Sequence, residues 1–72
     1  MHTHLLDHEI KMLNQIAANF AWDSDEERAA TTIASHIRRF WTPVMREQVT
    51  QANAAADIGL SPLARRALDL LA

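Results

Sequence analysis

The side chains best suited to metal chemistry in this 72-residue sequence are its four histidines, His2, His4, His8 and His36. His4 and His8 are four residues apart, so a helix would place them on one face at a spacing that suits a divalent metal. No third or fourth ligand follows nearby, and the chain has no cysteine to supply a thiolate. The sequence therefore predicts no metal site. We interpret His36 as a packed, hydrogen-bonded histidine at the edge of an apolar helix face.

Other catalytic motifs are also absent from the sequence. A single glycine cannot form a phosphate-binding loop, and no serine or threonine lies in a nucleophile-elbow motif. The acidic run at 23–27 is typical of a helix start, with Ser24 and Glu27 as a capping box and the other carboxylates near the positive end of the dipole. We therefore predict no catalytic residue and no cofactor bound by this chain.

The stretch "HIRRFWTPVMRE" at 36–47 combines basic and aromatic residues, as a nucleic-acid-binding surface would. Helical periodicity, however, puts Phe40 and Trp41 on the apolar side and Arg38 with Arg39 opposite. Base stacking needs aromatic and basic groups on one surface, and the net charge of −2 also disfavours a nucleic-acid partner. We expect Phe40 in the core and the two arginines in solvent.

Protein binding explains this stretch better. Trp, Met and Arg are enriched at interfaces, and Trp41, Met45 and Arg46 stand together near a helix corner. The following segment 48–56 carries no charge, and its narrow apolar stripe of mostly small side chains would let a partner approach closely. The predicted interface consists of Trp41, Met45, Arg46, Val49, Ala52 and Ala56.

We expect these residues to lie on helices, because no segment alternates apolar and polar residues as a half-buried strand does. We predict an all-α fold, a small bundle of three to four short helices in a single domain over 1–72, with residues 1–4 disordered. Thr42-Pro43 and Ser61-Pro62 are cap and first-turn pairs, and Gly59 is a helix stop. The expected helices span 5–21, 24 to 40 or 41, 43–56 and 62 to near the chain end.

The first helix has one feature that breaks its pattern. Its apolar face includes Phe20, and Asn14 and Gln15 fall on the opposite side, but Glu9 lies within the apolar arc. One interpretation is a loose first turn, where the dipole favours a carboxylate. The alternative is that Glu9 pairs with an arginine of a neighbouring helix or of a partner.

The short length of the chain and its lack of cysteine favour a protein that is stabilised by binding a partner. A single core of this size supplies only about 3–5 kcal/mol, and no disulfide can add to it. No signal peptide or membrane span is visible, which predicts a cytoplasmic protein. A self-associating helical module, whose homodimer buries the third helix, is the alternative to an accessory subunit.

Three blocks carry a resemblance to a known family: "KMLNQIAANF" (11–20), "HIRRFWTPVMR" (36–46) and "GLSPLARRAL" (59–68). In that order and spacing the chain resembles the small delta subunit of bacterial NAD-dependent, molybdenum-containing formate dehydrogenases. The resemblance covers about residues 10–71. The positions that match the family pattern, as candidates for fold or docking, are Asn14, Gln15, Phe40, Trp41, Pro43, Met45 and Arg46. Phe20 and Pro62 complete the structural motif with Asn14, Gln15, Phe40 and Pro43.

The resemblance implies a non-catalytic accessory subunit that binds the large catalytic (alpha) subunit and acts in assembly, cofactor maturation or stability. It also implies that the holoenzyme carries molybdopterin, iron–sulfur clusters, FMN and NAD on its other subunits. A further hypothesis is that outward arginines handle the molybdopterin cofactor or its precursor directly. These are Arg38, Arg39, Arg65 and Arg66.

Overall fold

The computed structural model describes residues 4–71, and within that range it contains four α-helices and no strand. The all-α prediction is confirmed. The predicted disorder of residues 1–4 lies outside the described residues except for His4, with which the first helix begins. The helices are α1 (His4–Asn19), α2 (Glu26–Phe40), α3 (Pro43–Ala55) and α4 (Pro62–Leu71).

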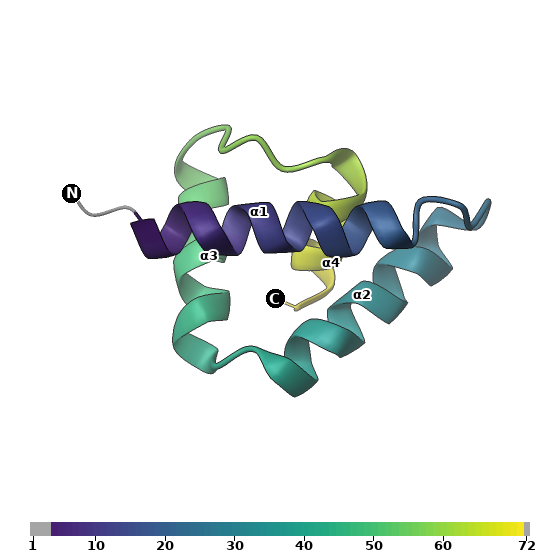
Figure 1. The fold of residues 1–72 in the computed structure, drawn as a ribbon, viewed down its shortest axis with the longest axis horizontal. Coiled ribbons are helices and arrows are strands. Elements are labelled where there is room, and N and C mark those ends of the chain that lie inside the picture. The colour runs from purple at the N-terminus through teal and green to yellow at the C-terminus, as the bar shows by residue number, and fades with distance from the viewer. Residues whose placement is uncertain (1–3, 72) are drawn as a thin grey trace.

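The helices cross at steep angles rather than lining up as a parallel bundle (Figure 1). Helix α1 runs along the long axis of the molecule and crosses α3 with its N-terminal half. Helices α2 and α3 diverge from the turn that joins them, and α4 packs mainly against α2. Short connections of this kind favour steeply crossed neighbours.

The core lies where the apolar faces of the four helices meet. Leu13 of α1, Ile33 and Ile37 of α2, Val49 of α3 and Leu68 of α4 are its largest fully buried side chains. In α2 the buried set follows the predicted helical arc, because Ala29, Ala30, Ile33, Ala34 and Ile37 recur at helical spacing. Trp41 is also covered and packs in the same cluster.

The start of α2 differs from the prediction. The cap is Asp25, whose side chain accepts a hydrogen bond from the Arg28 backbone N–H at 3.1 Å, and not Ser24. Asp23 favours this register because it accepts from the Asp25 backbone N–H at 2.9 Å and holds the Arg28 guanidinium. Glu27 consequently forms no capping box and instead binds Arg66 of α4.

The end of α2 corrects two further predictions. Phe40 is 66% exposed, and its ring centroid lies 4.7 Å from that of His36, which is also exposed. The backbone becomes extended at Trp41, so Trp41 rather than Phe40 turns into the core at the last position of the arc. His36 is therefore a surface residue that contacts an aromatic ring, not a packed core histidine.

The predicted starts of α3 and α4 are confirmed. Thr42 caps α3 by accepting from the Met45 N–H at 3.2 Å, and Pro43 takes the first turn. Ser61 accepts from the Ala64 N–H at 3.2 Å, and Pro62 begins α4. The first and third helices end earlier than expected, at Asn19 and Ala55, so Ala21 and Ala56 are exposed.

The connection between α3 and α4 depends on Gly59. Its φ of +85° lies in the left-handed region that other residues rarely adopt. Its backbone N–H donates to the Asp57 carboxylate at 3.0 Å, and its carbonyl accepts from Asn14 of α1. Gly59 is thus a turn residue that lies four residues beyond the end of α3.

Candidate interaction surfaces

The turn between α2 and α3 presents apolar side chains to solvent. Phe40 is 66% exposed and Val44 is 61% exposed, and the Arg39 guanidinium lies 5.6 Å from the centroid of the Phe40 ring. We call Phe40 and Val44 the apolar corner. Val44 follows Pro43 in the first turn of α3, so the turn that Thr42-Pro43 creates is what leaves this side chain outside the core.

The structure divides the six residues that the sequence predicts as an interface. Trp41 and Val49 are buried in the core, at 5% and 0% exposure, so the surface of the monomer does not offer their side chains to a partner. Met45, Arg46 and Ala52 are half-buried, and Ala56 is exposed beyond the end of α3. Their contact with a partner remains a prediction, and the exposed Phe40 and Val44 adjoin them.

A hollow adjoins the apolar corner on α3. It has a volume of about 470 Å³, and its lining residues are Pro43, Arg46, Glu47, Thr50, Gln51 and Leu71. The Nε atom of Arg46 is buried and has no hydrogen-bond partner among the described residues. Gln51 donates to Glu47 at 3.3 Å across one turn of the helix. Arg46 therefore belongs partly to the interior and partly to this hollow.

Glu9 is a second buried polar group without a partner. It is 5% exposed and lies inside the second turn of α1, so the interpretation as a loose first turn is wrong. Its Oε1 atom has no hydrogen-bond partner within the described part of the chain. Burial raises the pKa of the Glu9 carboxyl, and the neighbouring His8 acts against that rise. No arginine of a neighbouring helix forms an ion pair with it among residues 6–71.

The four arginines proposed to handle a cofactor do not all line one hollow: Arg65 and Arg66 share one, and Arg38 and Arg39 are not part of it. Arg38 donates to the Leu70 carbonyl at 2.6 Å, and Arg66 binds Glu27 with a shortest distance of 2.5 Å. Arg65 lies 3.9 Å from Asp57, and Arg39 lies over Phe40. Each side chain thus has a different neighbour within the fold. The hydrogen bond from Arg66 holds the pKa of Glu27 below its usual range.

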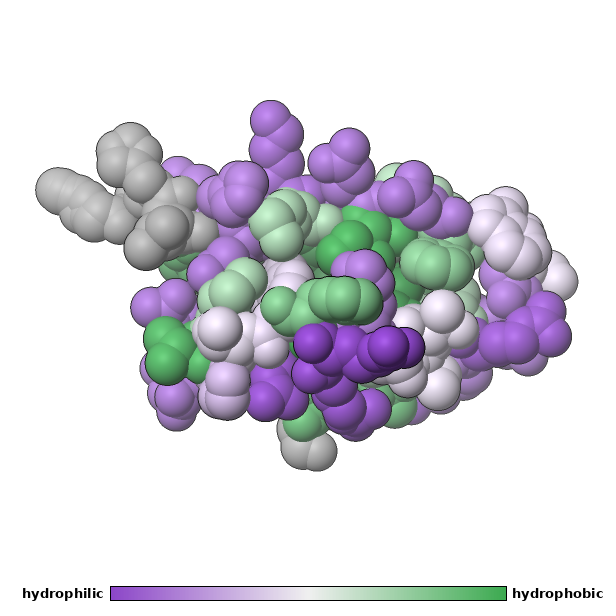
Figure 2. Space-filling view, turned by 60° about the horizontal axis from the view of Figure 1, so that its bottom comes forward, coloured by the Kyte–Doolittle hydropathy of each residue, from purple (hydrophilic) through white to green (hydrophobic). Residues whose placement is uncertain are grey.

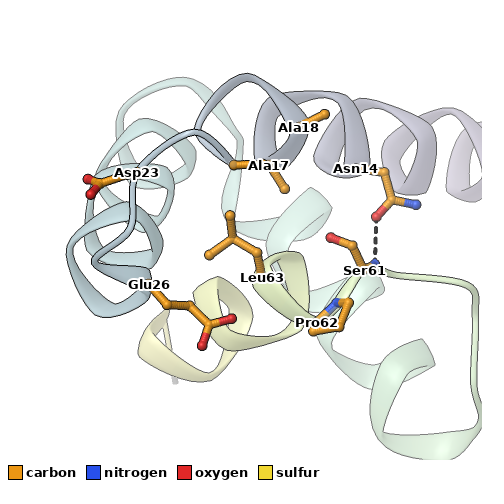
Figure 3. Close-up of a pocket in the computed structure, with 9 residues that line it drawn as sticks. Asn14, Ala17, Ala18, Asp23, Glu26, Ser61, Pro62 and Leu63 are labelled. Carbon is orange, nitrogen blue, oxygen red and sulfur yellow. Dashed lines mark hydrogen bonds between the residues drawn. The ribbon is translucent and has the colours of Figure 1, made fainter.

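A groove that the sequence did not predict lies between α1 and α4. We call it the α1–α4 groove; its volume is about 380 Å³ and its lining residues are Asn14, Ala17, Ala18, Ala21, Asp23, Glu26, Ser61, Pro62 and Leu63. Figure 3 shows Asn14 and Ser61 joined at one end, apolar side chains between the helices, and the carboxylates of Asp23 and Glu26 at the other end.

Asn14 fixes the geometry of this groove. Its Nδ2 donates to the Gly59 carbonyl at 2.9 Å, and its Oδ1 accepts from the Ser61 backbone N–H at 2.9 Å. Asn14 is half-buried rather than outward as predicted, because the loop before α4 folds back onto that side of α1. Helical periodicity places Asn14 near Lys11 and Gln15 on the polar side of α1, so the sequence did not indicate this contact.

The remaining positions of the family pattern and of the structural motif have structural places. Phe20 packs against the core, Gln15 is exposed, and Pro43 and Pro62 begin their helices at exposed positions. Phe40 is the large exposed aromatic of the apolar corner. The sequence also did not predict that Trp22 is exposed. Its side chain is 77% exposed, and its two neighbours in the sequence line the α1–α4 groove.

The surface as a whole is mixed. Figure 2 shows green apolar residues gathered in the middle of one face and strongly hydrophilic residues beside them. No group of three or more histidine, cysteine, aspartate or glutamate side chains within residues 4–71 is placed to hold a metal ion. In the same range, no helix has both the length and the apolar character needed to cross a membrane.

Fold and surface together define a small, steeply crossed four-helix protein whose candidate sites are interaction surfaces. The chain belongs to the NADH-dependent formate dehydrogenase delta subunit family, FdsD, whose model matches residues 8–68. It is a delta subunit of an NAD-dependent formate dehydrogenase, one component of an enzyme complex. No curated protein and no solved structure matches the chain.

Proposed function

We propose that this delta subunit is a non-catalytic accessory subunit that binds the large catalytic subunit of formate dehydrogenase in the cytoplasm. Binding assists assembly, cofactor maturation or stability of the complex. The molybdopterin, iron–sulfur clusters, FMN and NAD of the holoenzyme are held by other subunits. The family match over residues 8–68 is the observation that carries this proposal.

The apolar corner supports the proposal from the structure. Phe40 and Val44 leave more than half of their surface in water, although both are large apolar side chains. Burying them against a partner would be favourable by about 25 cal/mol for each Å² of apolar surface removed from water. Met45, Arg46 and Ala52 continue this surface along α3, where a partner can cover their exposed atoms. We propose that the catalytic subunit occupies this side of the molecule.

A purified complex of the remaining subunits, titrated with the full 72-residue chain, tests the proposal. Val44→Glu introduces a carboxylate into the apolar corner, and we expect it to weaken binding at least tenfold. The first turn of a helix favours a carboxylate, so this variant should fold like the wild type. Ser35→Glu is the matched control, because it adds the same charge at an exposed position of α2.

Failure of the wild-type chain to bind the catalytic subunit would contradict the accessory role. Equal binding of Val44→Glu and wild type would move the interface away from the apolar corner. Sedimentation of the isolated chain tests the alternative function, that of a self-associating helical module. A stable homodimer that Val44→Glu dissociates would identify the corner as a self-association surface.

A further inference from the structure

The α1–α4 groove lies on different elements from the apolar corner and has its own chemistry. Its walls are Ala17, Ala18 and Ala21 on the α1 side and Pro62 with Leu63 on the α4 side. A mostly apolar hollow with a few polar groups at its ends is the usual form of a binding pocket. Leu63 and Ala17 point into the space between the helices in Figure 3.

Hydrogen bonds brace the groove at both ends. Asn14 joins α1 to the start of α4 through two hydrogen bonds of 2.9 Å, and Ser61 caps α4 at the same end. At the other end, Asp23 is held by Arg28 through hydrogen bonds of 2.8 and 2.9 Å. A groove braced at both ends loses little entropy when a ligand enters it.

The charge of the groove is one-sided. Its lining includes the carboxylates of Asp23 and Glu26 and no lysine, arginine or histidine. Arg28 neutralises Asp23 and holds its pKa down to about 2, so Asp23 stays ionised. Glu26 forms no ion pair within 4 Å among the described residues. The nearby Arg66 interacts with its charge, but that guanidinium is hydrogen-bonded to Glu27. The rim therefore complements a positive charge placed beside an apolar group.

Trp22 adjoins the groove in sequence. It follows Ala21 and precedes Asp23, both of which line the groove, and its side chain is 77% exposed. Tryptophan is the residue type most enriched among those that contribute most to binding, and arginine or lysine packs favourably over its ring. An apolar segment with a flanking cation would thus find a hydrophobic slot and a carboxylate in the groove, and an exposed tryptophan on the adjoining turn.

We propose that the α1–α4 groove is a second docking site for the formate dehydrogenase complex. Its occupant is a segment of a partner subunit that inserts an apolar side chain between α1 and α4 and places a lysine or arginine beside Glu26. This inference rests on the proposed accessory function. It adds an interface on α1, α4 and the α1–α2 turn, separate from the apolar corner on α2 and α3.

Two variants test the groove by different means, both measured by titrating the full chain into the complex that lacks it. Ala18→Trp fills the groove from an exposed position, and Glu26→Lys reverses its charge. We expect each to raise the Kd at least tenfold. Ser35→Trp on the outer side of α2 and Asp7→Lys in the first turn of α1 are the matched controls, expected within twofold of wild type.

Melting followed by circular dichroism shows whether each variant is folded, and the two variants provide independent tests. Wild-type affinity for both Ala18→Trp and Glu26→Lys would overturn the groove proposal while the accessory function stands. Loss of self-association in Ala18→Trp, with unchanged binding to the complex, would also overturn it, since the occupant would then be a second copy. If the wild-type chain does not bind the complex at all, the accessory function itself fails.

Discussion

Helices α2 and α4 bury a broad apolar face, whereas α3 buries only Val49 among the described residues. The α2–α4 pair is also joined by polar contacts, from Arg66 to Glu27 and from Arg38 to the Leu70 carbonyl. Helix α3 has a narrow apolar stripe, and its first turn leaves Val44 in water. The α2–α4 pair therefore forms the main scaffold of the core, and α3 contributes less to it.

The polar interior shows the same difference. The two buried side-chain atoms without a hydrogen-bond partner in the described part of the chain are Glu9 Oε1 and Arg46 Nε. Arg46 belongs to α3, and Glu9 lies in the half of α1 that crosses α3 (Figure 1). An unpaired buried polar group costs free energy that a paired one does not. The α1–α3 side is thus where the fold has most to gain from a partner.

The largest expected effect is on the scaffold. Ile37→Ala removes a fully buried side chain from α2 and should lower the free energy of unfolding by about 2–5 kcal/mol. Because a core of this size supplies only about 3–5 kcal/mol, the variant should lose a large part or all of its stability. Urea denaturation followed by circular dichroism measures the change.

Val49→Ala is the comparison on α3. It removes less apolar volume from an equally buried position, so it should destabilise the chain less than Ile37→Ala and leave it folded. Equal destabilisation by the two substitutions would show that α3 belongs to the scaffold after all.

The next effect concerns the link between α1 and α4. Asn14→Ala removes two hydrogen bonds that hold the loop before α4, and we expect a loss of about 1–2 kcal/mol in the free energy of unfolding. Gln15→Ala changes an exposed neighbour and serves as the control, with little change expected. If both variants melt at the wild-type temperature, Asn14 does not brace the groove.

The smallest expected effect is a gain in stability from a substitution on the α1–α3 side. Because burial raises the pKa of Glu9, the folded state binds its proton more tightly than the unfolded state does, so wild-type stability falls as pH rises above about 4.5. Glu9→Gln keeps the shape without the charge and should be more stable than wild type at pH 7, by about 1 kcal/mol or less. Below pH 4.5 the difference should disappear.

Thermal melts of both proteins from pH 4 to pH 8 measure this difference. A stability difference that does not vary with pH would contradict the account of Glu9. The carboxyl of Glu9 is the only titratable group that the wild type has and the variant lacks.

The all-α fold class and the starts of α3 and α4 followed from the sequence because capping residues, prolines and helical periodicity are local signals. Thr42-Pro43 and Ser61-Pro62 set two helix starts within one turn, and the buried arc of α2 needed only its own spacing. Ser24 failed as a cap because Asp23 and Arg28 form a competing local arrangement that moves the cap to Asp25.

The candidate site depended on contacts between distant residues, and these were not predictable from periodicity. Phe40 and Trp41 are adjacent in sequence, yet an extended backbone at Trp41 buries one and exposes the other. The α1–α4 groove requires Asn14 to meet Gly59 and Ser61, which lie more than forty residues away. The periodicity of a single helix contains no information on the extended backbone at Trp41 or on the contacts of Asn14.

Amide hydrogen exchange, on the isolated full chain and on the chain in the formate dehydrogenase complex, tests the central claim most directly. The claim is that α2 and α4 form the stable scaffold and that the partner stabilises α3. We predict that α3 amides exchange faster than those of α2 and α4 in the isolated chain, and that they become at least tenfold slower in the complex. Equal protection of all helices in the isolated chain, unchanged on binding, would contradict the account.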